Sequence, residues 1–386
     1  MKFESAASAA NLLNCTVRAI QKWAKEGKIP CAYKDGRDWK IPTDAVRPDG
    51  DEPPRFYNEP FPIVHIYNVG EIEQYIESVA NIDDKNMTLC EYYYFTGRLK
   101  DCVLTAEPYL TSKNPILRSS AALFFLFANL CEGHTAWVRF AAEIISEEFE
   151  KSMLSDENTE VKAITVLFSM IIKMQLHLPI ENIPPMSEHM RYLDEGVRLF
   201  ACYLSAYAAY LEKDYQRSLG IVETALAFSE NLYPVSMIYL YIIGAMDYIN
   251  LLDTKKAIDF IEKAWSLSSP DGMFMPFVEH YNLLQGLIEK QLKKNHPEDY
   301  KRIIAAAKQY NLSWYEVYNE SGERLVAANL SHTEFTIAML YSRNWRAKEI
   351  AAHMELSERT IMNYITLIYD KLGINGKKEL EKYMLR

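Results

Sequence analysis

The sequence predicts a mainly α-helical protein in which a short two-helix motif near each end flanks a long helical middle. From about residue 69 to 312, apolar residues recur at helical spacing and no convincing alternating strand pattern occurs. Residues 47–62 are rich in proline, which restricts the backbone and predicts a stiff linker. Residues 5–25 and 348–372 each have the pattern of a short helix, a tight turn and a second amphipathic helix.

Charge is unevenly distributed along the 386 residues. The chain carries a net charge of −10, but residues 1–47 carry +4 and residues 330–386 carry +2, which leaves −16 on the middle. Attraction to a polyanion acts within a Debye length of about 10 Å, so the local surplus matters more than the total. The two ends are therefore candidates for anion binding, and the acidic middle is a candidate sensor or interaction surface.

Several classes of function find no support in the sequence. The six cysteines are scattered without a C-x-x-C pair, which predicts reduced thiols in a cytoplasmic protein and no zinc site. The N-terminus lacks a signal-peptide pattern, and the apolar stretches 121–131 and 237–252 are shorter than the roughly 20 residues that cross a membrane. No phosphate-binding glycine loop, metal-ligating histidine pair or nucleophile motif occurs. We expect no catalytic residue, cofactor or bound metal, and we expect His332 and His353 to lie at or near the surface.

The middle contains a degenerate repeat. Three segments align as a polar turn followed by a helix with a small residue near its start: residues 95–110, 211–228 and 249–267. The small residues are Cys102, Ser218 and Ala257, and small side chains let paired helices approach closely. In a fourth segment Ala136 follows Cys102 by 34 residues, which is the period of tetratricopeptide-type (TPR) repeats. The pattern predicts a TPR-like α-solenoid of five or six helix pairs, with an irregular helical bundle as the alternative.

Tyrosine is abundant in the middle, and many of these residues fall at helical spacing. Such tyrosines favour packing between helices, because the ring buries a large area. A concave aromatic surface for a peptide or small ligand is the alternative. The residues concerned are Tyr92, Tyr93, Tyr94, Tyr203, Tyr207, Tyr210, Tyr239, Tyr241 and Tyr248.

The closing motif predicts an exposed helix face. Ser357 is a suitable N-cap and Gly373 a suitable end for the second helix. Between them, four apolar residues at spacings of four, three and four form a buried stripe: Ile361, Ile365, Ile368 and Leu372. The opposite side then presents Arg359, Met362, Asn363 and Thr366. An outward row of this kind can lie in the major groove of DNA.

Residues 330–380 resemble the LuxR-type helix-turn-helix domain, a four-helix DNA-binding fold. The matching residues are Leu330, Ser331, Glu334, Lys348, Glu349, Ile350, Ala351, Leu356, Ser357, Thr360, Ile361, Lys371, Leu372, Gly373 and Ile374. The resemblance implies that Met362, Asn363 and Thr366 face DNA, that Lys348 and Thr360 approach its backbone, and that the domain pairs as a homodimer.

Four positions depart from the LuxR-type pattern: Thr333, Asn344, Met362 and Tyr364. Asn344 can adopt the left-handed turn of the usual glycine. Met362 replaces a common lysine, which weakens phosphate attraction but allows an apolar contact with a thymine methyl group. A domain that serves only packing or dimerisation is the alternative.

The opening motif resembles the excisionase/MerR-type winged helix-turn-helix over residues 5–47. Its second helix is expected to bury Val17, Ile20, Trp23 and Ala24, and the Asp-Gly turn predicts a two-stranded wing. Pro30, Trp39 and Ile41 would complete the core. The resemblance implies DNA contact through Thr16, Arg18, Gln21 and Lys22 on the helix and through Lys34 and Arg37 on the wing. The alternative is that these charged residues form a solvated face.

The sequence as a whole predicts a cytoplasmic bacterial transcriptional regulator. Its parts are a winged helix-turn-helix at 1–47, a proline-rich linker at 48–68, a helical-repeat sensor or interaction domain at 69–312, a linker at 313–329 and a LuxR-type helix-turn-helix at 330–386. The expected partners are double-stranded DNA, a second copy of the chain, and a peptide, small-molecule or protein effector on the middle. A helical-repeat adaptor that does not read DNA is the alternative function, and a recombination accessory factor is a third.

Overall fold

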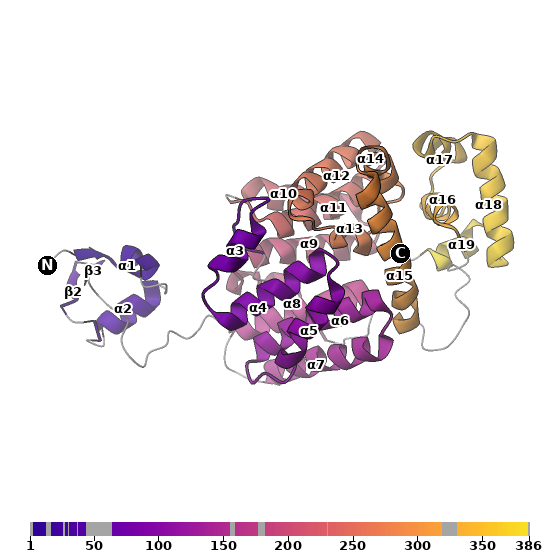
Figure 1. Ribbon diagram of the computed structural model, residues 1–386. Helices are drawn as coiled ribbons and strands as arrows, with labels where there is room; N and C mark the ends of the chain where they lie inside the picture. Colours follow the sequence, from indigo (N-terminus) through magenta and orange to yellow (C-terminus); the bar gives the residue numbers. More distant parts are fainter. Residues whose placement is uncertain are drawn as a thin grey trace. The chain divides into compact units, whose positions relative to one another are not determined.

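A computed structural model describes most of the chain and divides it into two compact units, Met1–Glu59 and Pro60–Arg386. The described residues are 3–12, 17–25, 28–29, 31–36, 38–43, 64–154, 159–176, 182–229, 231–318 and 330–384. Both units are built mainly from helices (Figure 1). Within these described ranges, no helix is long and apolar enough to cross a membrane.

The N-terminal unit combines two helices with a small sheet. Its elements are β1 (Phe3–Ser5), α1 (Ala6–Leu12), α2 (Val17–Lys25), β2 (Tyr33–Asp35) and β3 (Asp38–Pro42). The antiparallel sheet has the order β1-β3-β2, so the expected wing of β2 and β3 gains a third strand that the sequence reading missed. Gly36 turns the wing with φ of 61°, a conformation that glycine adopts without strain.

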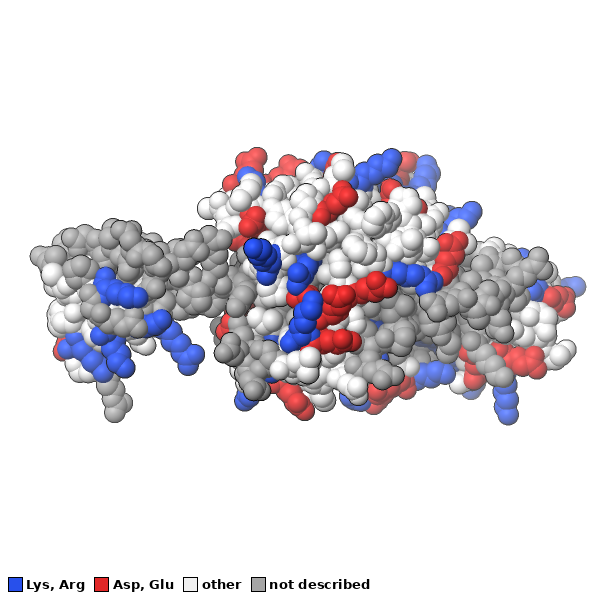
Figure 2. Space-filling model, turned by 90° about the horizontal axis from the view of Figure 1, so that it is seen from below, with Lys and Arg blue, Asp and Glu red and all other residues white. Residues whose placement is uncertain are grey.

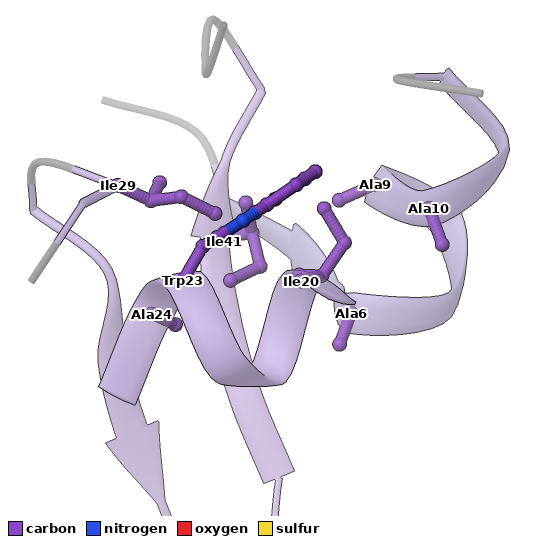
Figure 3. Packing of buried hydrophobic residues seen from close by; sticks show 8 residues of the cluster. All are labelled: Ala6, Ala9, Ala10, Ile20, Trp23, Ala24, Ile29 and Ile41. Atoms are coloured by element: carbon purple, nitrogen blue, oxygen red, sulfur yellow. The ribbon is translucent and has the colours of Figure 1, made fainter. Parts of the chain in front are cut away.

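A small apolar cluster holds this unit together (Figure 3). Trp23 and Ile20 of α2 pack with Ala9 of α1, Ile29 and Ile41, and each is almost fully buried. Val17 is 39% exposed, so its expected burial is wrong. The buried stripe of α2 starts one turn later, at Ile20. From α2, the apolar cluster includes only Ile20, Trp23 and Ala24. Trp39 is half-buried against the cluster, and Pro30 lies outside the described residues.

The second unit opens with the helical middle. Its helices are α3 (Ile72–Ser78), α4 (Ile82–Phe95), α5 (Leu99–Ala106), α6 (Pro115–Glu132), α7 (Thr135–Leu154), α8 (Thr159–Leu176), α9 (Glu195–Leu211), α10 (Tyr215–Phe228), α11 (Pro234–Asn250), α12 (Thr254–Ser268), α13 (Met275–Glu279), α14 (Leu287–Asn295) and α15 (Pro297–Tyr318). Short 3₁₀ turns η2 (Glu107–Tyr109), η3 (Met186–Glu188), η4 (Met190–Tyr192) and η5 (Ser269–Asp271) interrupt them. α15 extends through residues 313–318, the first part of the expected linker, and Trp314 there is buried.

Four helix pairs of the middle share one turn geometry. The pairs are α4–α5, α6–α7, α9–α10 and α11–α12. In each turn an amide bonds the carbonyl five residues earlier, and a residue with positive φ precedes it, as in the Schellman motif. The residues with positive φ are Gly97, Gly133, Lys213 and Leu252. This recurring turn is compatible with the predicted TPR-like solenoid.

The predicted small residues lie where paired helices meet, with one exception. Cys102, Ser218 and Ala257 have no exposed surface. Ala136 is exposed, so its expected equivalence to Cys102 is wrong. In α7 the fully buried position is Val138, half a turn later, because the turn after Gly133 starts the helix at Thr135.

The tyrosines mostly pack between helices, as the sequence favours. Tyr203, Tyr207, Tyr210, Tyr239 and Tyr248 are all buried. Glu279 accepts hydrogen bonds from the hydroxyl groups of Tyr94 (2.7 Å) and Tyr239 (3.0 Å). Tyr203 bonds Nε2 of the buried His280 at 2.8 Å. Burial, followed by the charge of Glu279, raises the pKa of Tyr94 well above its ordinary value. These tyrosines therefore bury their rings and still satisfy their hydroxyl groups.

The second unit ends with α16 (His332–Ser342), α17 (Ala347–Met354), α18 (Glu358–Leu372) and α19 (Lys377–Tyr383). The capping predictions are confirmed. Ser357 Oγ accepts the Thr360 amide at 3.1 Å, and Gly373 ends α18 with φ of 63°. Ile361, Ile365, Ile368 and Leu372 are the buried residues of α18. Asn344 adopts φ of 69°, as expected for a residue that replaces glycine there.

Candidate nucleic-acid interface

The outer face of α18 carries a short row of different chemical groups. Arg359, Met362, Asn363 and Thr366 are all exposed, and Met362 is 48% exposed. A guanidinium can bond phosphate or guanine, an amide can pair with adenine, and a thioether can contact the thymine methyl group. Further along the same face, Leu367 is 42% exposed and Asp370 is exposed. The negative charge of Asp370 restricts the DNA-compatible part of the face to the first half of the helix.

A buried carboxylate fixes α18 against α16. Glu334 is 3% exposed, and its side chain accepts the Ser331 amide at 2.6 Å and Lys371 Nζ at 2.7 Å. Burial alone would raise the pKa of Glu334, but the hydrogen bonds from Lys371 and Ser331 outweigh it and lower that pKa. Glu334 therefore caps α16 and holds the end of α18 through one group. Both residues match the family pattern in the sequence, but their pairing depends on the packing of α16 against α18.

The inner face of this helix-turn-helix packs on the middle of the chain. Arg343 Nη1 donates to Asn250 Oδ1 at 2.8 Å and also to the Tyr210 hydroxyl. His332 Nε2 lies 2.6 Å from Glu289 Oε1. Burial alone would raise the pKa of Glu289, but the interactions with His332 and Tyr281 outweigh burial and lower that pKa. These contacts come from α16 and from the turn before α17, and they leave the outer face of α18 exposed.

His353 lies in the same contact and corrects a prediction. It is 4% exposed rather than at the surface, and its Nε2 donates to the Gln285 carbonyl at 2.7 Å. Burial lowers its pKa, which favours the neutral imidazole. The helical period alone could have placed His353 on the inner face of α17, three residues after Ile350.

The N-terminal unit presents a second candidate face. Arg18, Gln21 and Lys22 are exposed on α2, opposite the buried Trp23, and Lys34 is exposed on β2. On the face shown in Figure 2, this unit carries lysine and arginine side chains with few acidic side chains among them. A local surplus of positive charge suits contact with phosphates. The expected contacts Thr16 and Arg37 lie outside the described residues.

The remaining predicted DNA contacts differ in their exposure and in the hydrogen bonds that they already make. Lys348 is exposed on α17, where a lysine can reach a phosphate. Thr360 is half-buried, and its hydroxyl lies 2.7 Å from Ser357 Oγ in the cap of α18. Thr366 Oγ1 donates to the Met362 carbonyl at 3.1 Å and keeps its acceptor capacity. In the part of the chain that the structure describes, no cluster of His, Cys, Asp or Glu could hold a metal ion.

The chain has two helix-turn-helix motifs, and each exposes polar side chains on the outer face of its second helix. These features place the chain in the class of DNA-binding proteins. Comparison with known families agrees with this class. Residues 328–384 match the family model of bacterial regulatory proteins of the luxR family, and residues 5–47 match a helix-turn-helix domain model. Both matches are to DNA-binding domains rather than to enzymes. No curated protein and no solved structure matches the chain.

Proposed function

We propose that this protein is a bacterial transcriptional regulator that binds promoter DNA through α18 and through α2, under control of its helical middle. The observation that carries the proposal is the exposed row on α18, in a domain that matches luxR-family regulators. The proposed DNA contacts are Lys348, Arg359, Thr360, Met362, Asn363 and Thr366 at the C-terminal end, with Thr16, Arg18, Gln21, Lys22, Lys34 and Arg37 at the N-terminal end.

Control by the middle is proposed from the contact between it and the C-terminal helix-turn-helix. Arg343, His332 and His353 all bond residues of the middle. An effector that shifts α9, α11 or α14 would change the position or freedom of α18. Pairing of two chains on a two-fold site would add affinity, and this homodimer remains a prediction from the family resemblance.

The test is sequencing of genomic fragments that the purified full-length chain captures at low salt. Three forms are compared: the unaltered chain, Arg359→Ala/Asn363→Ala on α18, and Arg18→Ala/Lys22→Ala on α2. Lys301→Ala/Arg302→Ala in α15 is the matched control, since it also removes two exposed cations. We expect the unaltered chain and the control to enrich one motif, and the α18 variant to lose or change it.

Other outcomes reassign the function. If only the α2 variant loses the motif, the N-terminal unit reads DNA and the C-terminal motif serves packing or pairing. If none of the forms, the unaltered chain included, enriches any fragment, the helical-repeat adaptor is the better function. A melting temperature for each variant excludes loss of folding as the cause.

A further inference from the structure

A large groove lies on the helical middle. It encloses about 1070 Å³ between α9 and α10, with a wall from α8, η3 and η4. Its lining follows α9 from Glu195 to Ala208, which at 1.5 Å per helical residue is about 20 Å. Sites for small ligands usually enclose about 300–1,000 Å³, so this groove is at the upper end of that range or above it. An extended chain of about six residues has the same length.

A glycine in the middle of a helix lines the floor of the groove beside open space. Gly220 lies inside α10, and a Cβ atom placed on it would meet nothing within 4 Å. Glycine inside a helix costs about 1 kcal/mol relative to alanine. No neighbouring side chain requires its small size, whereas close approach of a ligand would require it. Ser205 and Ala208 also line the groove, with short side chains, from α9.

The walls are apolar and adaptable. Met170, Met186 and Met190 line one side, and methionine adapts its shape to varied apolar partners. Phe228 stands at the rim with 81% of its surface exposed, which is unusual for a large aromatic side chain without a partner. Apolar groups of a ligand would therefore be sheltered along the centre of the groove.

Positive charge lies toward both ends of the groove. α9 and α10 are joined by a short turn, so Arg198 near the start of α9 and Arg217 near the start of α10 lie toward opposite ends. Arg198 donates to the Leu193 carbonyl at 2.9 Å, and Arg217 pairs with Glu212 at 3.2 Å on the surface. Glu195, the acidic residue in the lining, accepts a hydrogen bond from the Tyr233 hydroxyl at 3.0 Å. Two arginines and one glutamate leave the lining with a net charge of +1 in an otherwise acidic middle, and this surplus favours an anionic ligand.

We propose that this groove binds a short peptide segment with apolar central residues and an acidic residue toward each end. A peptide fits the length of the groove, its open apolar floor and the separation of its two cations. The inference deepens the proposed function, because the bound peptide would be the effector of the regulator. Binding itself does not depend on that function and can be measured without DNA.

The experiment selects from a displayed random octapeptide library on the full-length chain. Selected peptides are synthesised with a fluorescent label, and their affinities are measured by anisotropy. Three variants are compared: Gly220→Trp, which fills the floor; Arg198→Ala/Arg217→Ala, which removes the cations; and Ala305→Trp, a control at an exposed alanine of α15 that does not line the groove. Melting temperatures establish that each variant is folded.

We expect selected peptides to carry Asp or Glu on both sides of an apolar centre. Their affinity should fall at least tenfold in Gly220→Trp and in the arginine variant, and should be unchanged in Ala305→Trp. The proposal is overturned if no peptide is enriched, if enriched peptides lack acidic residues, or if Gly220→Trp binds them equally well. Sodium dodecanoate is titrated in parallel, and its binding without any enriched peptide would assign the groove to an anionic amphiphile instead.

A second readout separates the site from its role. If a selected peptide binds the groove but leaves the affinity for the captured DNA motif unchanged, the site stands and its regulatory role is rejected. If no DNA motif is ever captured, the peptide affinities still decide whether the groove is a binding site.

Discussion

Single residues of α18 carry the expected sequence preference. Asn363 is the one exposed side chain in the row that both donates and accepts hydrogen bonds through an amide, the geometry that pairs with adenine. Asn363→Ala should weaken binding to the captured motif by about 5- to 150-fold, since a bidentate pair is worth about 1–3 kcal/mol. Binding to unrelated DNA should change little. Electrophoretic mobility shifts with both DNAs measure the difference.

Asp370→Ala is the matched control for Asn363→Ala on the same helix. It removes a negative charge from the outer face, so affinity should stay the same or rise for every DNA. A similar loss in both variants would mean that α18 is merely destabilised, and equal losses on both DNAs in Asn363→Ala would contradict base reading.

Asp247 predicts a pH dependence of stability. It is fully buried, Ser218 Oγ donates to its Oδ2 at 2.6 Å, and Arg343 lies near enough to act on its charge. Burial raises the pKa of Asp247 to about 8, against an ordinary value near 4. Between these values the unfolded chain releases the proton and the folded chain holds it, so stability falls as pH rises from about 4 to 8.

Asp247→Asn should remove this loss, because the amide oxygen can still accept from Ser218. The variant should melt at a higher temperature than the unaltered chain at pH 8, by an amount equivalent to a few kcal/mol, and the difference should shrink toward pH 5. Asp259→Asn is the control, since that exposed carboxylate pairs with Lys263 at 2.8 Å on the surface. A difference that is constant with pH would contradict the assigned pKa.

At the scale of elements, the N-cap Ser357 stabilises the start of α18, the helix that carries the proposed DNA-binding face. Ser357→Ala removes the acceptor for the Thr360 amide and should cost about 1 kcal/mol. The loss should appear as faster amide exchange in the first turn of α18, which contains Arg359 and directly precedes Met362. Ser331→Ala at the cap of α16 is the comparison. Unchanged exchange at residues 358–361 would show that the cap does not limit fraying.

Elements were predictable where local chemistry defines them. Ser357, the stripe from Ile361 to Leu372, and Gly373 fix α18 through capping and period, which depend on neighbours in sequence. β1 was not predictable, because three residues become a strand only when β3 pairs with them. The exposed face of α18 followed from its buried stripe, but the pairing of Glu334 with Lys371 joins two elements and needed tertiary structure.

On the scale of the whole molecule, the contact of α16 and α17 with the middle is the route that we propose for the action of an effector. Arg343→Ala removes the hydrogen bonds to Asn250 and Tyr210, and charged hydrogen bonds contribute about 1.5–3 kcal/mol. Amides of α16 and α17 should exchange about 10- to 100-fold faster. Arg359→Ala, which removes an exposed arginine from the outer face of α18, should leave exchange unchanged. Equal protection in Arg343→Ala would mean that the contact does not hold the domain.

The proposal that both ends bind one DNA makes the salt dependence of the full chain informative. The middle carries −16 and is repelled by DNA, so attraction must come from the ends, each with a small positive surplus. Two weak contacts on one chain reinforce each other when the linker lets both reach their sites. Each phosphate contact contributes about −0.9 to the slope of log affinity against log salt.

The variant Arg18→Ala/Lys22→Ala should therefore reduce the magnitude of this slope by about two, if both cations contact phosphates. The DNA is a fragment that carries the motif captured through α18. Lys301→Ala/Arg302→Ala should leave the slope unchanged, because those cations pair with Glu298 and Asp299 on the surface of the middle. Fluorescence anisotropy from about 50 to 200 mM salt gives the slopes. An unchanged slope in the α2 variant would show that the N-terminal unit does not bind beside α18. Its charged face would then serve a different partner or a second DNA segment.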